Sequence, residues 1–248
     1  MFWFLAFALA WAITVPLATN QLGYTQIEGL RFQFGFAIGL APAIAAIVAS
    51  AFEKRFKDYW RTAWNPRAPV WLYLLALSLP CLLLAVPFAW AAIRRAAPPE
   101  LEFGPDIAAF AAVWLVLALG EELGWRSYAL PRLTQRFGFL VGTTILGVIW
   151  CVWHYPKMLS GPFVESIPQA APFIALFSLQ IVIANYIICW IAARARFSSL
   201  PTTVFHTAFN TVSTVYGMAA MDPSITAVMA IVAIVLLIID RRPQGAGL

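Results

Sequence analysis

The sequence is poor in charged residues. Asp, Glu, Lys and Arg together make up 11% of its 248 residues, whereas a soluble globular domain carries about 25%. Hydrophobic residues make up 62% of the chain, compared with about 45–50% in soluble domains. So little charge cannot cover the surface of a globular domain with polar groups. The composition therefore excludes an ordinary soluble protein and predicts an integral membrane protein surrounded mainly by lipid.

The sequence also lacks the short alternating segments that build membrane β-barrels, and it has long continuous apolar stretches instead. A helix that crosses the ~30 Å hydrocarbon core needs about 20 apolar residues, so most of the chain fits about eight such helices with short loops. We therefore predict an all-α polytopic membrane helix bundle that forms a single membrane domain over residues 1–248. The expected spans are 2–19, 32–52, 70–93, 107–130, 137–155, 171–193, 200–219 and 225–240.

Cysteine is scarce as well. The three cysteines, Cys81, Cys151 and Cys189, all fall within apolar stretches. We interpret them as buried small apolar residues and not as a disulfide framework. A concentrated basic patch is also missing, because the Lys and Arg residues are spread over short loops. The net charge of +5 therefore indicates contact with the headgroups of a lipid bilayer and not with nucleic acid.

The Lys and Arg residues are distributed unequally between the two sides of the predicted bundle. With eight spans, 12 of the 16 lie on one side and four on the other. The positive-inside rule places the richer side in the cytoplasm. We therefore expect both termini in the cytoplasm and a multi-pass protein of the bacterial cytoplasmic membrane. The richer side holds Lys54, Arg55, Lys57, Arg61, Arg67, Arg126, Arg132, Arg136, Arg194, Arg196, Arg241 and Arg242.

Two short segments carry more specific expectations. Residues 131–137 mix basic and apolar side chains, which predicts a short interfacial helix. Gly35 and Gly39 form a G-x-x-x-G pattern in the second span. Such a pattern allows close helix packing, and packing within the bundle is favoured here over dimerisation. The oligomeric state stays open.

Acidic residues are nearly absent from the predicted helix interiors. Of the eleven in the chain, only Glu121 and Glu122 lie well inside an apolar stretch. A charge at mid-helix costs about 2.5–3.5 kcal/mol on insertion scales, so two adjacent carboxylates indicate a use. Arg126 follows Glu122 by four residues and shares its helix face, so the two can pair. Glu121 points about 100° away and stays available for chemistry.

Histidine is rarer still. His154 and His206 are the two in the chain, and both fall in predicted helices. Asn210 follows His206 by four residues, so an amide and a ring N–H can bind one developing anionic oxygen. Each residue alone also has an ordinary structural explanation, such as packing or contact between helices. Both histidines, both embedded acids, an arginine and an asparagine on three helices together predict one shared site.

These residues resemble the CPBP family, which includes the CAAX prenyl endopeptidases and many Abi-type proteins. The family pattern is Glu-Glu-x-x-x-Arg, then Phe-x-x-x-His, then His-x-x-x-Asn or Asp. Here it is matched by Glu121, Glu122 and Arg126, by 150–154 with Trp150 in place of Phe, and by 206–210. The resemblance covers a catalytic core of approximately residues 107–217.

The resemblance implies hydrolysis of peptide bonds within the membrane. In a metal-free mechanism, Glu121 with His154 activates water, and His206 with Asn210 forms the oxyanion hole. This version is favoured because it gives each residue a role, so no cofactor is expected. The alternative is a catalytic zinc ion held by Glu121, His154 and His206. Counted from the expected cytoplasmic helix ends, however, His154 lies roughly 12–16 Å deeper in the membrane than Glu121 and His206.

The expected substrate is a membrane-associated peptide or protein, for which a lipidated (prenylated) tail is one option. Two other function classes stay open. Intramembrane Glu, Arg and His also mark proton pathways, as in a proton-coupled transporter. A non-enzymatic, bacteriocin-immunity-type membrane protein is the second. A nucleophilic Cys151, one turn before His154, is the least favoured alternative.

Overall fold

The computed structural model describes residues 1–101, 106–161, 164–217 and 221–239, and every regular element among them is helical. The all-α prediction is therefore confirmed. The elements in order are α1 (Phe2–Gln21), the 3₁₀ helix η1 (Phe32–Leu40), α2 (Ala41–Phe52), α3 (Phe56–Ala63), α4 (Val70–Leu84), α5 (Val86–Arg94), α6 (Ile107–Gly124), the π-helical turn η2 (Trp125–Ala129), α7 (Leu130–Phe137), α8 (Phe139–Leu159), α9 (Ile167–Arg194), α10 (Ser199–Tyr216) and α11 (Pro223–Ile239).

Six helical stretches within the described residues are long and apolar enough to cross a membrane, so the chain is an integral, multi-pass membrane protein. The other two predicted spans correspond to α10 and α11. α11 is apolar but has only 17 residues, and α10 is less apolar because it carries the polar residues of the predicted site. The expected ends of these two spans, Ala219 and Asp240, lie outside the described residues, as do Arg241 and Arg242.

Two predicted spans are divided in the structure, and a further one is extended. The second begins as the 3₁₀ helix η1, and the third breaks at Ala85 between α4 and α5. Pro87 lies in the first turn of α5, where its missing N–H leaves no helical hydrogen bond unmade. The fourth continues without interruption from α6 through η2 into α7. The short helix predicted at 131–137 is present as α7, and its interfacial position stays a prediction. The short helix α3 was not predicted.

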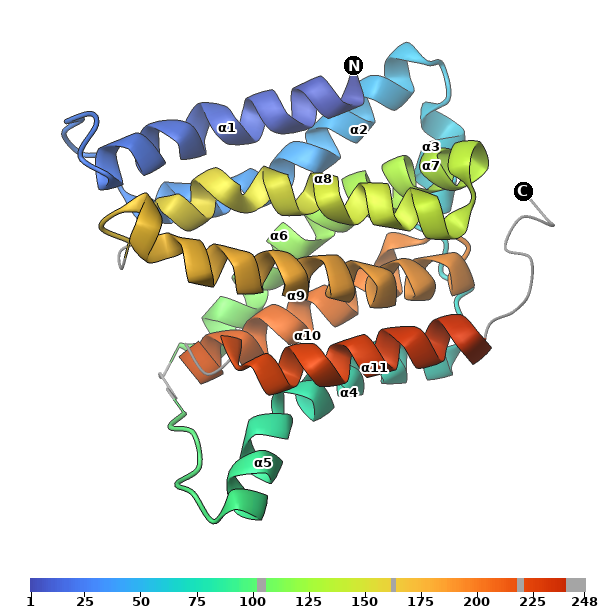
Figure 1. The fold of residues 1–248 in the computed structure, drawn as a ribbon. Helices are drawn as coiled ribbons and strands as arrows, with labels where there is room; N and C mark the ends of the chain where they lie inside the picture. The colour runs from blue at the N-terminus through green and yellow to red at the C-terminus, as the bar shows by residue number, and fades with distance from the viewer. Residues whose placement is uncertain (102–105, 162–163, 218–220, 240–248) are drawn as a thin grey trace.

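The segments predicted to share the basic side contact one another. Tyr128 and Arg132 both donate hydrogen bonds to the carboxylate of Glu53. Ser199 Oγ donates to the carbonyl of Ala63 at 2.8 Å. Figure 1 shows the start of α1 and the end of α11 toward the same end of the bundle as α3 and α7. The even number of crossings is therefore consistent with the helix arrangement, and the cytoplasmic assignment of this end stays a prediction.

Close backbone contacts hold α6 against η1 and α2. A Cβ atom at Gly120 would collide with the carbonyl oxygen of Gly39, and one at Gly124 would collide with the backbone of Pro42. Only glycine allows the two chains to approach this closely. The G-x-x-x-G interpretation is confirmed at Gly39, whose neighbour is Leu117 of the same chain. This contact lies directly beside Glu121 and Glu122 and sets their position in the bundle.

Candidate active site

A cavity of about 210 Å³ lies among α6, α8, α9 and α10. It contains four of the predicted site residues, which come from three different helices. The structure thus brings Glu121, His154, His206 and Asn210 together. α9, which was not expected to contribute, supplies four of the apolar lining residues, more than any other helix. The lining residues are Trp114, Glu121, Trp150, His154, Lys157, Met158, Phe177, Gln180, Ile181, Ala184, Ile188, Phe205, His206, Phe209 and Asn210.

Trp150 of α8 lies at the centre of the site. Its indole N–H donates a hydrogen bond of 2.7 Å to Oε2 of Glu121, and its ring lies 4.1 Å from the guanidinium carbon of Arg126. The same ring contacts His154 and His206 edge to face, with centroid distances of 5.4 and 5.6 Å. The sequence indicated only an aromatic residue at this position. The structure shows that the indole also provides a donor that phenylalanine lacks.

Glu121 is 7% exposed, and its hydrogen bond from Trp150 is to a neutral donor. The π-helical turn η2 follows it by four residues and contains Arg126. Such turns are frequent at functional sites because they shift the register of the residues that follow. As predicted, Arg126 pairs with Glu122 and leaves Glu121 free of an arginine partner. The carboxylate of Glu121 is therefore available to a water molecule in the cavity.

Glu122 contacts both Arg126 and His206 in a buried network. Its Oε1 lies 3.0 Å from Nη1 of Arg126 and 2.9 Å from Nδ1 of His206. The arginine keeps Glu122 ionised, because an opposite charge favours the charged form of a carboxyl group. The carboxylate then accepts a hydrogen bond from Nδ1–H of His206. Nε2 of His206 is left for the cavity, and the carboxylate stabilises the ring when it carries both protons.

His154 has a different environment. Its Nδ1 lies 2.7 Å from the backbone carbonyl oxygen of Trp150, one turn earlier on α8. A carbonyl oxygen only accepts hydrogen bonds, so Nδ1 of His154 carries the proton. Nε2 of the neutral ring therefore holds the free lone pair. Its edge-to-face neighbours Trp153 and Phe177 carry no charge that would stabilise an imidazolium.

Asn185 of α9 supports the network, and sequence reasoning missed it. Its side-chain oxygen accepts a hydrogen bond from Nη2 of Arg126 at 3.3 Å, and its amide donates to the carbonyl of Thr143 at 2.8 Å. Asn185 is fully buried in an otherwise apolar helix. That placement was the available signal, because a buried amide needs partners. Asn185 thus connects α8 and α9 to the arginine.

The expected depth difference between His154 and the other site residues is wrong. α6, η2 and α7 form one helical stretch that turns at Gly138 into α8, so the predicted helix end near 130 was too early. Glu121 precedes Gly138 by 17 residues and His154 follows it by 16. The stretch from α6 to α7 and the helix α8 are antiparallel, so Glu121 and His154 lie at a similar distance from the turn and therefore at a similar depth in the bundle. The hairpin at Gly138 therefore explains why the two meet.

Two alternatives receive no support from the geometry. Cys151 does not line the cavity, and its thiol lies 3.5 Å from the hydroxyl of Tyr155. No three His, Cys, Asp or Glu side chains among the described residues lie close enough to hold one metal ion. Glu121, His154 and His206, the ligands of the zinc alternative, all line the cavity. A zinc requirement stays a question for a chelation experiment.

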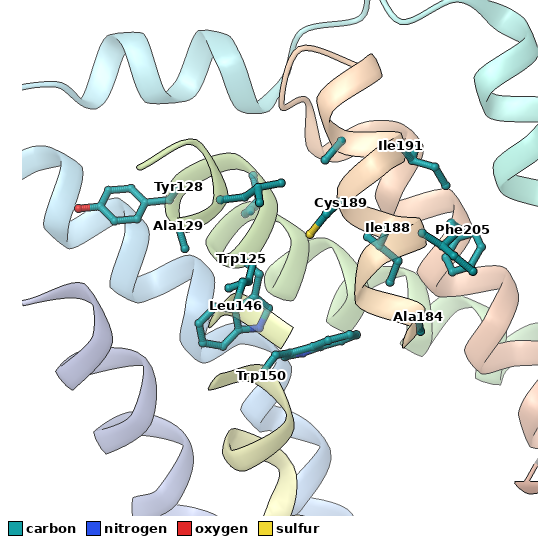
Figure 2. Close-up of a cluster of buried hydrophobic side chains, with 14 of the residues drawn as sticks. Trp125, Tyr128, Ala129, Leu146, Trp150, Ala184, Ile188, Cys189, Ile191 and Phe205 are labelled. Carbon is teal, nitrogen blue, oxygen red and sulfur yellow. The ribbon is translucent and has the colours of Figure 1, made fainter. Parts of the chain in front are cut away.

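Apolar packing around Trp150 keeps these groups in place. Figure 2 shows Trp150 and Leu146 of α8 in a buried cluster with Trp125 of η2 and with Ala184 and Ile188 of α9. Trp125 and Leu146 are fully buried. A rigid apolar surround lowers the local dielectric and strengthens the interactions of the charged groups within it.

A comparison with known families agrees with the arrangement of these residues. The model of the family described as type II CAAX prenyl endopeptidase Rce1-like matches residues 103–212, which include all three motifs. Residues 103–212 of this chain are therefore similar to this family. This confirms the CPBP resemblance of the sequence.

One curated relative is CAAX prenyl protease 2 of Methanococcus maripaludis. The two are 26% identical over 176 residues, which cover 70% of this chain and 65% of the relative. The chain thus spans about 65% of the length of the curated protein that it matches.

Proposed function

We propose that this protein is an intramembrane endopeptidase that hydrolyses a peptide bond of a membrane-associated substrate. One observation carries the proposal: Glu121, His154, His206 and Asn210 line a single cavity within the helix bundle. The similarity of residues 103–212 to the Rce1-like family and the name of the curated relative support the same activity. A protein or peptide with a prenylated tail is the substrate class that these names suggest.

Glu121 and His154 activate the water in this mechanism. The Glu121 carboxylate takes a proton from water while the oxygen attacks the carbonyl carbon of the substrate. The free lone pair on Nε2 of His154 accepts the second hydrogen of that water and orients it. Glu121 then passes its proton to the leaving nitrogen as the C–N bond breaks. Trp150 holds Glu121 in position throughout, through its 2.7 Å hydrogen bond.

His206 and Asn210 stabilise the oxygen that becomes negatively charged. Nδ1–H of His206 is committed to Glu122 at 2.9 Å. Nε2 of His206 therefore donates to the oxyanion only when the ring is protonated, and the Glu122 carboxylate favours that form. The Asn210 amide supplies a second donor. Glu122 and Arg126 thus act by holding and charging His206, not by contacting the substrate.

A peptidase assay on the purified protein tests the proposal. The protein is reconstituted in liposomes with fluorogenic peptides that carry a prenyl or acyl anchor, and hydrolysis is measured with and without a strong chelator. Hydrolysis that persists with chelator supports the metal-free mechanism, and loss that zinc restores supports the zinc alternative. If no hydrolysis occurs but an imposed pH gradient drives proton flux that depends on Glu121, the transporter alternative is correct.

A further inference from the structure

Lys157 is a basic residue in the cavity that the proposed chemistry does not use. It lies in the last turn of α8 and lines the same cavity as Glu121 and His154. Its ammonium lies 4.8 Å from the ring centre of Phe36 and 5.5 Å from that of Trp114. Within the described part of the chain, no carboxylate lies within ion-pair distance of this ammonium.

The position of this charge is unusual for a lysine in a membrane helix. Such lysines usually extend to the headgroups or pair with an acid. Lys157 instead contacts two aromatic faces, which attract a cation but leave its N–H donors without strong acceptors. The Glu121 carboxylate interacts with it electrostatically from across the cavity, but accepts its hydrogen bond from Trp150. The ammonium therefore retains the capacity to bind an anion that enters the cavity.

Lys157 lies at a useful distance from the reaction centre. It follows His154 by three residues, so the two share a helix face. Three residues advance about 4.5 Å along a helix, and an extended peptide advances about 3.3–3.6 Å per residue. A carboxylate held by Lys157 thus lies roughly one to three peptide residues from a bond held at Glu121 and His154.

We propose that Lys157 binds a carboxylate of the peptide substrate and thereby determines which peptide bond lies at the reaction centre. The inference rests on the proposed peptidase function and assigns it a specificity-determining residue. Two sources offer the same chemistry: the carboxylate at the end of a peptide chain, or an Asp or Glu side chain near the cleaved bond.

The test uses one anchored peptide in four forms. The first ends in a free carboxylate and the second in an amide. The third and fourth also end in an amide and carry Glu or Gln near the cleaved bond. If Lys157 binds the terminal carboxylate, the wild-type protein should cleave the first peptide with a kcat/KM roughly tenfold to hundredfold higher than the second. If it binds an acidic side chain, the Glu peptide should be favoured over the Gln peptide by a similar factor. Lys157→Met should abolish this preference, Lys157→Arg should retain most of it, and Lys57→Met, at an exposed position of α3, should not change it.

Binding of the same peptides to the Glu121→Gln protein separates this inference from the proposed function. A binding preference for the carboxylate that disappears on Lys157→Met supports the inference even if the wild-type protein cleaves nothing, in which case the peptidase proposal fails alone. Equal binding and cleavage of charged and neutral forms by the wild-type protein would overturn the inference and leave the peptidase proposal intact. A Lys157→Met protein that keeps its preference but shows a shifted pH–rate profile would make Lys157 a charge partner of Glu121 and overturn the inference as well.

Discussion

The two sides of the cavity contain the same residue types, a glutamate and a histidine, in opposite environments. On one side, Glu122 and His206 belong to a buried ionic network with Arg126. On the other side, Glu121 and His154 have neutral partners, both supplied by Trp150. A network of opposite charges fixes the protonation and position of its members. Groups with neutral partners keep a free lone pair and can exchange protons, so in the proposed mechanism the difference separates the oxyanion side from the proton-transfer side.

Glu121→Gln changes the side of the cavity with neutral partners and should have the largest effect on the rate of hydrolysis. The amide keeps the shape of the side chain but cannot accept a proton, so the rate of hydrolysis should fall by about 10²–10⁴-fold. The melting temperature in detergent should stay close to that of the wild-type protein. Glu165→Gln, at an exposed loop position, is the control with unchanged rate. Full turnover by Glu121→Gln would remove Glu121 as the base.

Arg126→Ala should disrupt the buried ionic network of Glu122, Arg126 and His206. It leaves the Glu122 carboxylate buried without its arginine, and breaking a buried pair costs about 3–5 kcal/mol. We expect lower yield and a lower melting temperature in detergent, together with loss of activity. Arg136→Ala, at an exposed position of α7, should change neither measurement appreciably. Normal stability of Arg126→Ala would contradict the structural role of the ion pair.

Trp150→Phe sharpens the comparison, because it restores the aromatic residue of the family pattern and removes the indole donor to Glu121. Loss of one hydrogen bond to a charged group corresponds to about 1.5–3 kcal/mol, so kcat should fall by roughly tenfold or more. Trp190→Phe is the matched control, because no described residue accepts a hydrogen bond from Nε1 of Trp190. If both variants retain full activity, the Trp150–Glu121 hydrogen bond has no part in the reaction.

The smallest effect is expected far from the cavity, at Glu53. Burial raises the pKa of this carboxyl group, but hydrogen bonds from Tyr128 and Arg132 and the charges of Arg132 and Arg55 outweigh it and lower the pKa overall. A lowered pKa in the folded state stabilises the protein above the unfolded pKa of about 4.3, and this contribution disappears as the pH falls through the folded pKa. The ion pair is partly exposed, so the gain is about 0–1 kcal/mol.

Thermal melts of wild-type and Glu53→Gln proteins between neutral pH and the acid range check this expectation. The melting temperature of the wild-type protein should exceed that of the variant at neutral pH, and this difference should disappear on acidification. An advantage that grows on acidification would show that the sign is wrong.

Much of the fold followed from local chemistry. Long apolar stretches have no stable place outside lipid and must satisfy their backbone internally, so composition predicted a helical membrane protein. The cost of embedding Glu121 and Glu122, and the four-residue spacing of Glu122 and Arg126, were visible in the sequence because they depend on one helix alone. The break at Ala85 was less visible, because apolar residues continue on both sides of it.

Tertiary structure decided which partner each group has. No spacing links Glu122 to His206, 84 positions away, or Arg126 to Asn185, 59 positions away. The sequence suggested Glu122 as the partner of Arg126 alone, whereas packing of α10 against α6 adds His206 as a second partner. Lys157 was assigned to a loop, and only the extension of α8 to Leu159 places it in the cavity. Contacts between helices distant in the chain depend on how their faces meet, and that is a property of the assembled bundle.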